Sequence, residues 1–198
     1  MKPPEELISR LENAAIENLK KDNHLQPVIL GFKDSEMIVI EGAVIKELDL
    51  DWNNSSHRQI IYRLAYLKGL ILDIKNFVFI TEAWVRILKE GVKSPENYEE
   101  FEEFYQSNRD NPDIWQRTEQ AVLFIDWDKE YSLSFAEIFR SGPTDEFPVT
   151  HVGEFVESPE QISFHSSMHA QARSEAEILF KNIPEDMKEN LFTKHRLE

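Results

Sequence analysis

Two pairs of short β-forming runs constrain the fold of this chain more than any other feature. The first pair is 28–32 and 37–40, and the second pair is 119–126 and 131–140. In each pair, four polar or turn-forming residues separate runs rich in branched and aromatic side chains, which is typical of a β-hairpin. A further run, 77–85, is apolar at nearly every position, as expected for a strand covered on both faces. These runs predict a mainly antiparallel sheet of about five strands.

Three other stretches have the periodicity of amphipathic helices. Apolar residues recur every three or four positions over 4–22, over 56–74 and over 169–182. Asn54 and Ser55 are the candidate caps for the second helix. Gly69 lies inside that helix at a cost of about 1 kcal/mol relative to alanine. We expect a close approach to a neighbouring strand to compensate for this cost, and a helix that ends before Gly69 is the alternative.

The remaining segments predict an insertion and an extension of one domain. Residues 91–118 form an acidic insertion, with a short helix expected at 96–106. Residues 141–198 form a loop-rich and helical C-terminal extension, with one short strand expected near 151–156. Because the chain has 198 residues, one domain is the natural expectation. Two hairpins around a central strand, with helices packed on them, predict a single α+β domain over 1–198.

The order of these elements resembles that of two known groups of domains. Over residues 4–140, the order of helix, hairpin, helix and strands resembles that of roadblock and profilin-like domains. The first four elements also resemble the opening of the cytidine-deaminase fold. Deaminase chemistry requires a glutamate two residues after a histidine, together with paired cysteines. The chain has His57-Arg58-Gln59 at the start of the second helix and no cysteine, so this chemistry is excluded.

The charge and the lack of cysteine exclude several classes of function. The chain has 22 basic and 37 acidic residues, a net charge of −15, and most of the excess lies in the second half. Without a basic stripe to neutralise phosphates, we expect no nucleic-acid partner, and likewise no anionic membrane surface. The absence of cysteine excludes disulfides, thiolate catalysis and cysteine-ligated metals. With no apolar signal or bilayer-spanning segment visible, we expect a soluble cytoplasmic protein.

Glu82 is the candidate catalytic residue. In a strand over 77–85 it points to the same face as Val78 and Ile80, because side chains alternate along a strand. A carboxylate on an apolar face either pairs with a cation or has a raised pKa. Such acids in clefts are functional candidates, although structural ion pairs are commoner. The candidate partners of Glu82 are Arg58, Arg63 and Arg86.

His165 and His169 are the candidate metal ligands. Residues four apart share one face of a helix, so both imidazoles would reach one zinc ion. A third ligand would come from His151, Glu154 or Glu175. The simpler interpretation is that the two histidines are solvated or bonded to backbone at a helix start, because six histidines make such a pair common by chance.

Other motifs give no specific chemistry. The six glycines are scattered singly, so the chain has no P-loop, no dinucleotide-binding loop and no nucleophile elbow. Asp126, Asp128 and Glu130 at the tip of the second hairpin offer oxygen ligands for a hard cation. The same spacing suits an ordinary polar turn, which is the preferred interpretation because aspartate tolerates turn geometry.

The insertion contains the candidate interaction residues. In the helix expected there, Phe101, Phe104 and Tyr105 form an apolar stripe, and the glutamates among them form the outer face. The stripe either packs on its own domain as a lid or binds a protein partner or a second copy. The preferred hypothesis is a non-enzymatic protein-interaction module. The alternative is a hydrolase that uses Glu82 with a metal ion or the histidines of 151–169, and a DNA mimic is a third, minor hypothesis.

Overall fold

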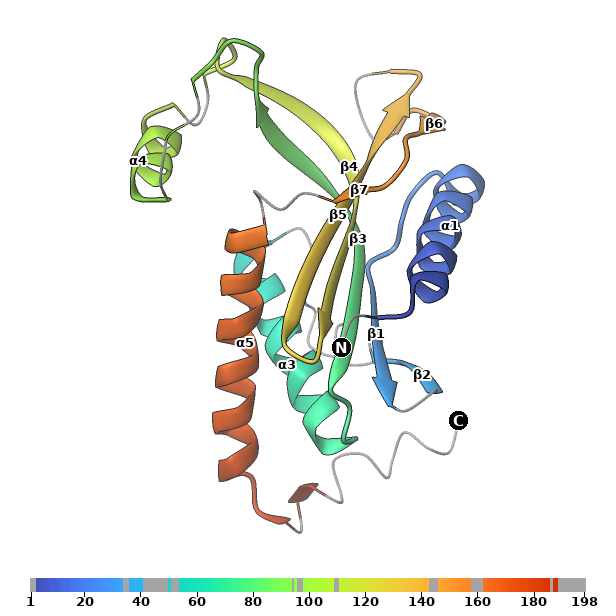
Figure 1. The fold of residues 1–198 in the computed structure, drawn as a ribbon, viewed down its shortest axis with the longest axis vertical. Coiled ribbons are helices and arrows are strands. Elements are labelled where there is room, and N and C mark those ends of the chain that lie inside the picture. Colours follow the sequence, from blue (N-terminus) through green and yellow to red (C-terminus); the bar gives the residue numbers. More distant parts are fainter. Residues whose placement is uncertain are drawn as a thin grey trace.

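The computed structural model describes residues 3–33, 36–40, 50, 54–93, 95, 98–108, 111–142, 146–157, 162–185 and 187–188, and all statements below concern this part of the chain. Its helices are α1 (Glu5–Asp22), α3 (Ser55–Ile71), α4 (Tyr98–Asn108) and α5 (Ile162–Asn182). Its strands are β1 (Val28–Lys33), β2 (Glu36–Val39), β3 (Asn76–Leu88), β4 (Trp115–Trp127), β5 (Glu130–Arg140), β6 (Val149–Val152) and β7 (Val156–Glu157) (Figure 1).

The strands form one antiparallel sheet. It has seven strands in the order β2-β1-β3-β4-β5-β6, and β7 also pairs with β5. The predicted α+β class with a mainly antiparallel sheet is therefore confirmed, with seven strands instead of about five. The additional strands arise mainly at the β5 edge. There, the single strand expected near 151–156 is split into β6 and β7, and Gly153 between them donates its N–H to the Glu137 carbonyl at 2.8 Å.

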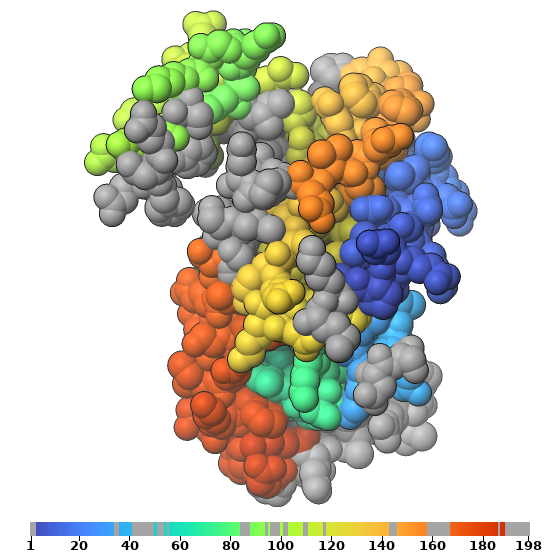
Figure 2. Space-filling view, in the orientation of Figure 1, coloured from blue at the N-terminus to red at the C-terminus, as the bar shows by residue number. Residues whose placement is uncertain are grey.

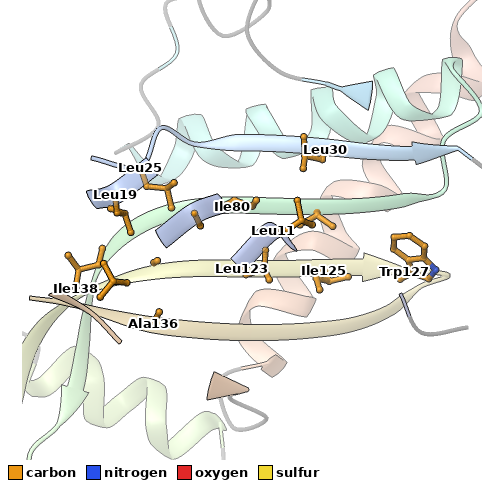
Figure 3. Packing of buried hydrophobic residues seen from close by; sticks show 14 of the residues in the cluster. Leu11, Leu19, Leu25, Leu30, Ile80, Leu123, Ile125, Trp127, Ala136 and Ile138 are labelled. Atoms are coloured by element: carbon orange, nitrogen blue, oxygen red, sulfur yellow. The ribbon is translucent and has the colours of Figure 1, made fainter. Parts of the chain in front are cut away.

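Helices cover both faces of the sheet. Helix α1 packs on one face, where its Leu11 and Leu19 join a cluster with sheet residues such as Ile80 and Leu123 (Figure 3). Helices α3 and α5 pack side by side on the other face, over Phe79 and its neighbours (Figure 1). Successive β3 residues belong to alternate clusters from 77 to 80, so this part of the strand is covered on both faces, as predicted.

Local chemistry explains the start and the middle of α3. The Asn54 side chain accepts the backbone N–H groups of Ser56 and His57, so the predicted cap is confirmed. A Cβ atom at Gly69 would overlap the Phe77 ring, at 2.7 Å from its Cε1 atom. This confirms the expected close approach to a strand, because Phe77 begins the buried part of β3.

Two predicted boundaries were wrong. Strand β4 begins at Trp115 and not at residue 119, because β3 and β4 pair with each other as far as Leu88↔Trp115. This pairing includes the polar residues 116–118, which have no strand pattern of their own. Helix α5 begins at Ile162, seven residues before the predicted start, and so includes the whole stretch from His165 to His169.

The ends of β3 and β4 leave the main sheet as a two-stranded extension. Strand β1 pairs with β3 only as far as Ile80, and β5 pairs with β4 only from Glu119 onward. We call Val85–Leu88, Trp115–Thr118 and α4 together the arm. Helix α4 lies at the end of the arm, set apart from α1, α3 and α5 in the ribbon view (Figure 1), and the green atoms of this region lie at one end of the molecule in the space-filling view (Figure 2).

None of the helices in the described ranges combines the length and the apolar composition that crossing a membrane requires.

Candidate functional site

Glu82 lies on the α1 face of β3, beside the end of α1. Its Oε2 atom accepts the Leu25 backbone N–H at 2.9 Å, and its Oε1 atom lies 3.6 Å from Nδ1 of His24. Nη2 of Arg140 lies 3.9 Å from Oε2. The Glu82 side chain is 24% exposed, and that of His24 is 49% exposed. A carboxylate, an imidazole and a guanidinium therefore meet at this position.

These partners of Glu82 differ from the predicted ones. Arg58 and Arg63 belong to α3, on the opposite side of the sheet, and Arg63 forms an ion pair with Glu175 of α5. The side chain of Arg86 lies outside the described residues. The sequence analysis missed Arg140, which lies 58 positions away along the chain.

Arg140 is the centre of a buried charged cluster. Its Nε and Nη2 atoms donate to the two carboxylate oxygens of Glu119 at 2.5 and 2.7 Å, in the bidentate geometry typical of strong arginine pairs. Nη1 donates to the backbone carbonyls of Asn23 at 3.0 Å and Phe147 at 2.9 Å. The Arg140 and Glu119 side chains are each 3% exposed. We call Arg140, Glu119, Glu82 and His24 the Arg140 cluster.

The Arg140 cluster ties separate segments to the sheet. Through Arg140 and Glu82, the end of α1, the connector before β1 and the loop at Phe147 are bonded to three neighbouring strands. The predicted hairpin placed Glu119 and Arg140 at the same end of adjacent strands, and this was the signal that would have found the pair. Only Glu82 and His24 of the cluster reach solvent appreciably.

His169 lies on the other face of the sheet, in an aromatic cage. Its side chain is 1% exposed. Its ring stacks on Phe124 with centroids 3.9 Å apart, and it lies 4.3 Å from the Tyr62 ring and 4.4 Å from the Phe79 ring. Its Nδ1 atom is 3.1 Å from the Tyr66 hydroxyl. His169 therefore lies in the core between α3, α5 and the sheet.

The hydroxyl of Tyr66 links His169 to a buried ion pair. Oδ2 of Asp126 accepts from the Tyr66 hydroxyl at 2.9 Å and from Nη2 of Arg173, also at 2.9 Å. Arg173 further donates to the Lys75 carbonyl at 2.9 Å, and its guanidinium lies over the Tyr66 ring, 5.1 Å from the centroid. We call Tyr66, Asp126, His169 and Arg173 the Tyr66 cluster. It joins α3, β4 and α5.

Burial raises the pKa values of three groups in and beside the Tyr66 cluster. Desolvation raises the pKa of Asp126, and the positive charge of Arg173 and the Tyr66 hydrogen bond partly oppose the shift. Desolvation also raises the pKa of Tyr66 well above its usual range, with a further contribution from the Asp126 charge. Burial raises the pKa of Tyr62 to about 12. The two tyrosines therefore stay protonated at neutral pH.

Most of the proposed zinc ligands either have other partners or lie outside the described residues. The His165 side chain lies outside the described residues, so the pair of His165 and His169 stays a prediction. His151 contacts the Phe139 ring, and Glu175 is paired with Arg63. In the described ranges, no group of three or more histidine, aspartate or glutamate side chains is arranged to hold a metal ion. His169 and Glu82 also face opposite sides of the sheet.

The acidic hairpin tip forms a turn. Asp128 and Lys129 have φ values of 51° and 66°, the left-handed conformations of a tight two-residue hairpin turn. Asp126 points away from this tip into the Tyr66 cluster. The polar-turn interpretation therefore describes this segment.

The arm contains the candidate interaction residues. The rings of Phe104 and Tyr105 lie 5.9 and 5.6 Å from that of Trp115, whose Nε1 donates to the Asn108 carbonyl at 2.7 Å. Helix α4 is thereby attached to the start of β4. The side chain of Phe101 lies outside the described residues. The helix sequence contains four glutamates and no basic residue, and Glu100 and Glu103 are exposed.

Comparison with known proteins adds no identification. No protein-family model, no curated protein and no solved structure matches the chain. The resemblance of the element order to roadblock, profilin-like and deaminase domains therefore stays a prediction.

Proposed function

We propose that this protein is a non-enzymatic cytoplasmic interaction module whose arm binds a protein partner with a basic surface. The observation that supports this most is the position of α4. An acidic helix with aromatic residues lies at the end of a two-stranded extension, apart from the helices that cover the sheet (Figure 1). Aromatic residues are enriched at the centres of protein interfaces, and charged residues are common at their rims.

Charge favours a basic partner over a second copy. The chain has a net charge of −15, and α4 adds four acidic side chains without a basic one. Two copies that met through their arms would bring like charges together, which costs free energy and slows association. A basic surface would instead be attracted over a distance of about 10 Å at moderate salt.

The buried clusters support a structural interpretation of the other candidate residues. Arg140 bonds to a carboxylate and to two backbone carbonyls, and Asp126 bonds to a hydroxyl and a guanidinium. Both clusters connect elements that are distant in the sequence. These are the interactions expected of groups that hold a fold together, because a buried charge without them would be strongly destabilising.

Charge reversal on α4 tests the proposal. The probe is a fluorescein-labelled peptide with four Lys-Val repeats, and the reference is the matching peptide with four Glu-Val repeats. We expect the full-length protein to bind only the lysine peptide, and the double variant Glu100→Lys, Glu103→Lys to bind it at least tenfold more weakly. The control is Glu130→Lys, Glu137→Lys, which changes the same charge at exposed sites on β5. Equal losses in both variants would contradict a role for the arm.

Glu82 supports a second candidate, a hydrolase. The specific observation is that Glu82, His24 and Arg140 meet where two of them are accessible, although the histidine is not one of those in 151–169. A panel of p-nitrophenyl esters and phosphates tests this candidate. Hydrolysis by the wild type that disappears in Glu82→Gln would support it, and a wild-type rate equal to the buffer rate would reject it.

A further inference from the structure

The outer edge of β3 is open beyond Ile80. Strand β1 pairs with β3 from Phe32↔Asn76 to Val28↔Ile80, and β3 continues to Leu88. Beyond Ile80, the only strand that pairs with β3 in the described part of the chain is β4, and the hydrogen bond from Leu25 in the connector before β1 goes to the Glu82 side chain and not to the strand backbone. The opposite edge of Glu82–Leu88 therefore offers backbone groups to a further strand.

The hydrogen-bond alternation shows which groups these are. In an antiparallel sheet, a residue directs its N–H and C=O to one neighbouring strand, and the next residue directs them to the other. Ile40 donates to the Ile29 carbonyl at 2.8 Å. The backbone N–H and C=O groups of odd-numbered β1 residues therefore point to β2, and those of even-numbered residues point to β3. Val28 is paired with Ile80, so the backbone groups of Ile80 point to β1. The backbone groups of the other even-numbered β3 residues point in the same direction, away from β4.

Two contacts agree with this assignment. Lys89, an odd-numbered residue just beyond β3, donates to the Ile114 carbonyl at 2.9 Å, on the β4 side. The Glu82 carbonyl accepts from its neighbour's hydroxyl, Oγ1 of Thr81, at 3.1 Å. The backbone groups directed to the open edge are therefore those of Glu82, Trp84, Arg86 and Leu88.

We propose that the basic partner binds here as an added β-strand, with an extended segment along Glu82–Leu88. This inference rests on the proposed function and names how the partner is held. Main-chain hydrogen bonds to a sheet edge give affinity, and alternate side chains give specificity. Natural sheet edges are usually blocked by proline, by a bulge or by a covering element. Glu82–Leu88 contains no proline and pairs with β4 without a register shift.

Charge complementarity selects the occupant. The edge belongs to the same arm as α4, and the four glutamates of α4 outnumber the two arginines of the arm, Arg86 and Arg117, so the arm as a whole attracts lysine or arginine side chains. A second copy would bring its own α4 and its own net charge of −15 to the same place. An extended basic segment satisfies both the backbone edge and the charge.

Residue-resolved amide hydrogen exchange of the full chain tests this mode of binding. In the free protein, the amides of Trp84, Arg86 and Leu88 should exchange fast, and those of residues 83, 85 and 87 should be slow. Saturation with the Lys-Val peptide should slow the even-numbered amides at least tenfold and leave the odd-numbered ones unchanged. The Glu-Val peptide should change neither set.

The outcomes separate the two proposals. If the Lys-Val peptide does not bind, the proposed function fails and the added strand fails with it. If the peptide binds and the even-numbered amides still exchange fast, the added strand is refuted and the binding arm stands. If those amides are already protected without peptide, and their protection increases with protein concentration, a second copy is the occupant and a basic partner is refuted.

Discussion

Two glutamates lie beside Arg140, and removing the charge of each should lower the stability of the protein by very different amounts. Replacing Glu119 with glutamine removes a carboxylate that receives two hydrogen bonds from Arg140 and is 3% exposed. Replacing Glu82 with glutamine removes a carboxylate that is 24% exposed and 3.9 Å from the same guanidinium. The two variants have the same chemistry, so each is the matched control of the other.

The expected magnitudes follow from burial. Breaking a buried ion pair by removing one partner costs about 3–5 kcal/mol, because the remaining charge is left uncompensated. For Glu82, glutamine keeps an oxygen that accepts the Leu25 N–H, and removal of one of two carboxylates near Arg140 also relieves their repulsion. Exposed pairs contribute about 0–1 kcal/mol, so we expect a loss of about 1 kcal/mol or less for Glu82→Gln.

Urea unfolding followed by tryptophan fluorescence measures both values. A loss of 3–5 kcal/mol corresponds to a fall in Tm of about 6–20 °C for a chain of this size, and a loss below 1 kcal/mol to less than about 4 °C. Two results would refute this reasoning: an equal loss of stability in both variants, or a loss below about 1 kcal/mol for Glu119→Gln. Either result would mean that the buried Arg140–Glu119 pair is not the main stabilising contact of the Arg140 cluster.

Three further changes test the packing and the titration of the α3 and α5 side. Gly69→Ala should cost about 1–3 kcal/mol through its clash with the Phe77 ring, and Phe77→Leu in the same chain should recover part of it; additive losses in denaturant unfolding would contradict the clash. Raising the pH from 10 to 12 should remove about 2 kcal/mol of stability through Tyr62, because the folded pKa of about 12 exceeds the unfolded value of 10.0 and the protonated form is favoured by the fold. Tyr62→Phe should abolish this part of the pH dependence, measured by urea unfolding at each pH. Arg173→Met should destabilise less as the pH falls from 8 to 5, because loss of the Arg173 charge raises the pKa of Asp126 further and the variant gains more from protonation of this buried carboxylate; equal losses at both pH values would argue against the ion pair.

Local patterns were sufficient to predict most of the elements. The helix over 4–22, the two hairpins, the cap at Asn54 and the tight contact at Gly69 each depend on neighbours along the chain or on one adjacent strand. The boundaries at Trp115 and Ile162 were wrong where the local pattern was weak. In the first case the partner strand, and not the residue's own propensity, extends the strand.

The sequence by itself determined the alternation of strands and helices, the acidic character and the exclusion of cysteine chemistry, because these depend on composition and on spacing along the chain. Only the tertiary structure decided that Glu82 meets Arg140 and His24, that His169 lies among aromatic rings, and that the end of β3 is an open edge. These features join residues that are far apart in the chain. They follow from which strands become neighbours and where each pairing stops, and periodicity does not contain that information.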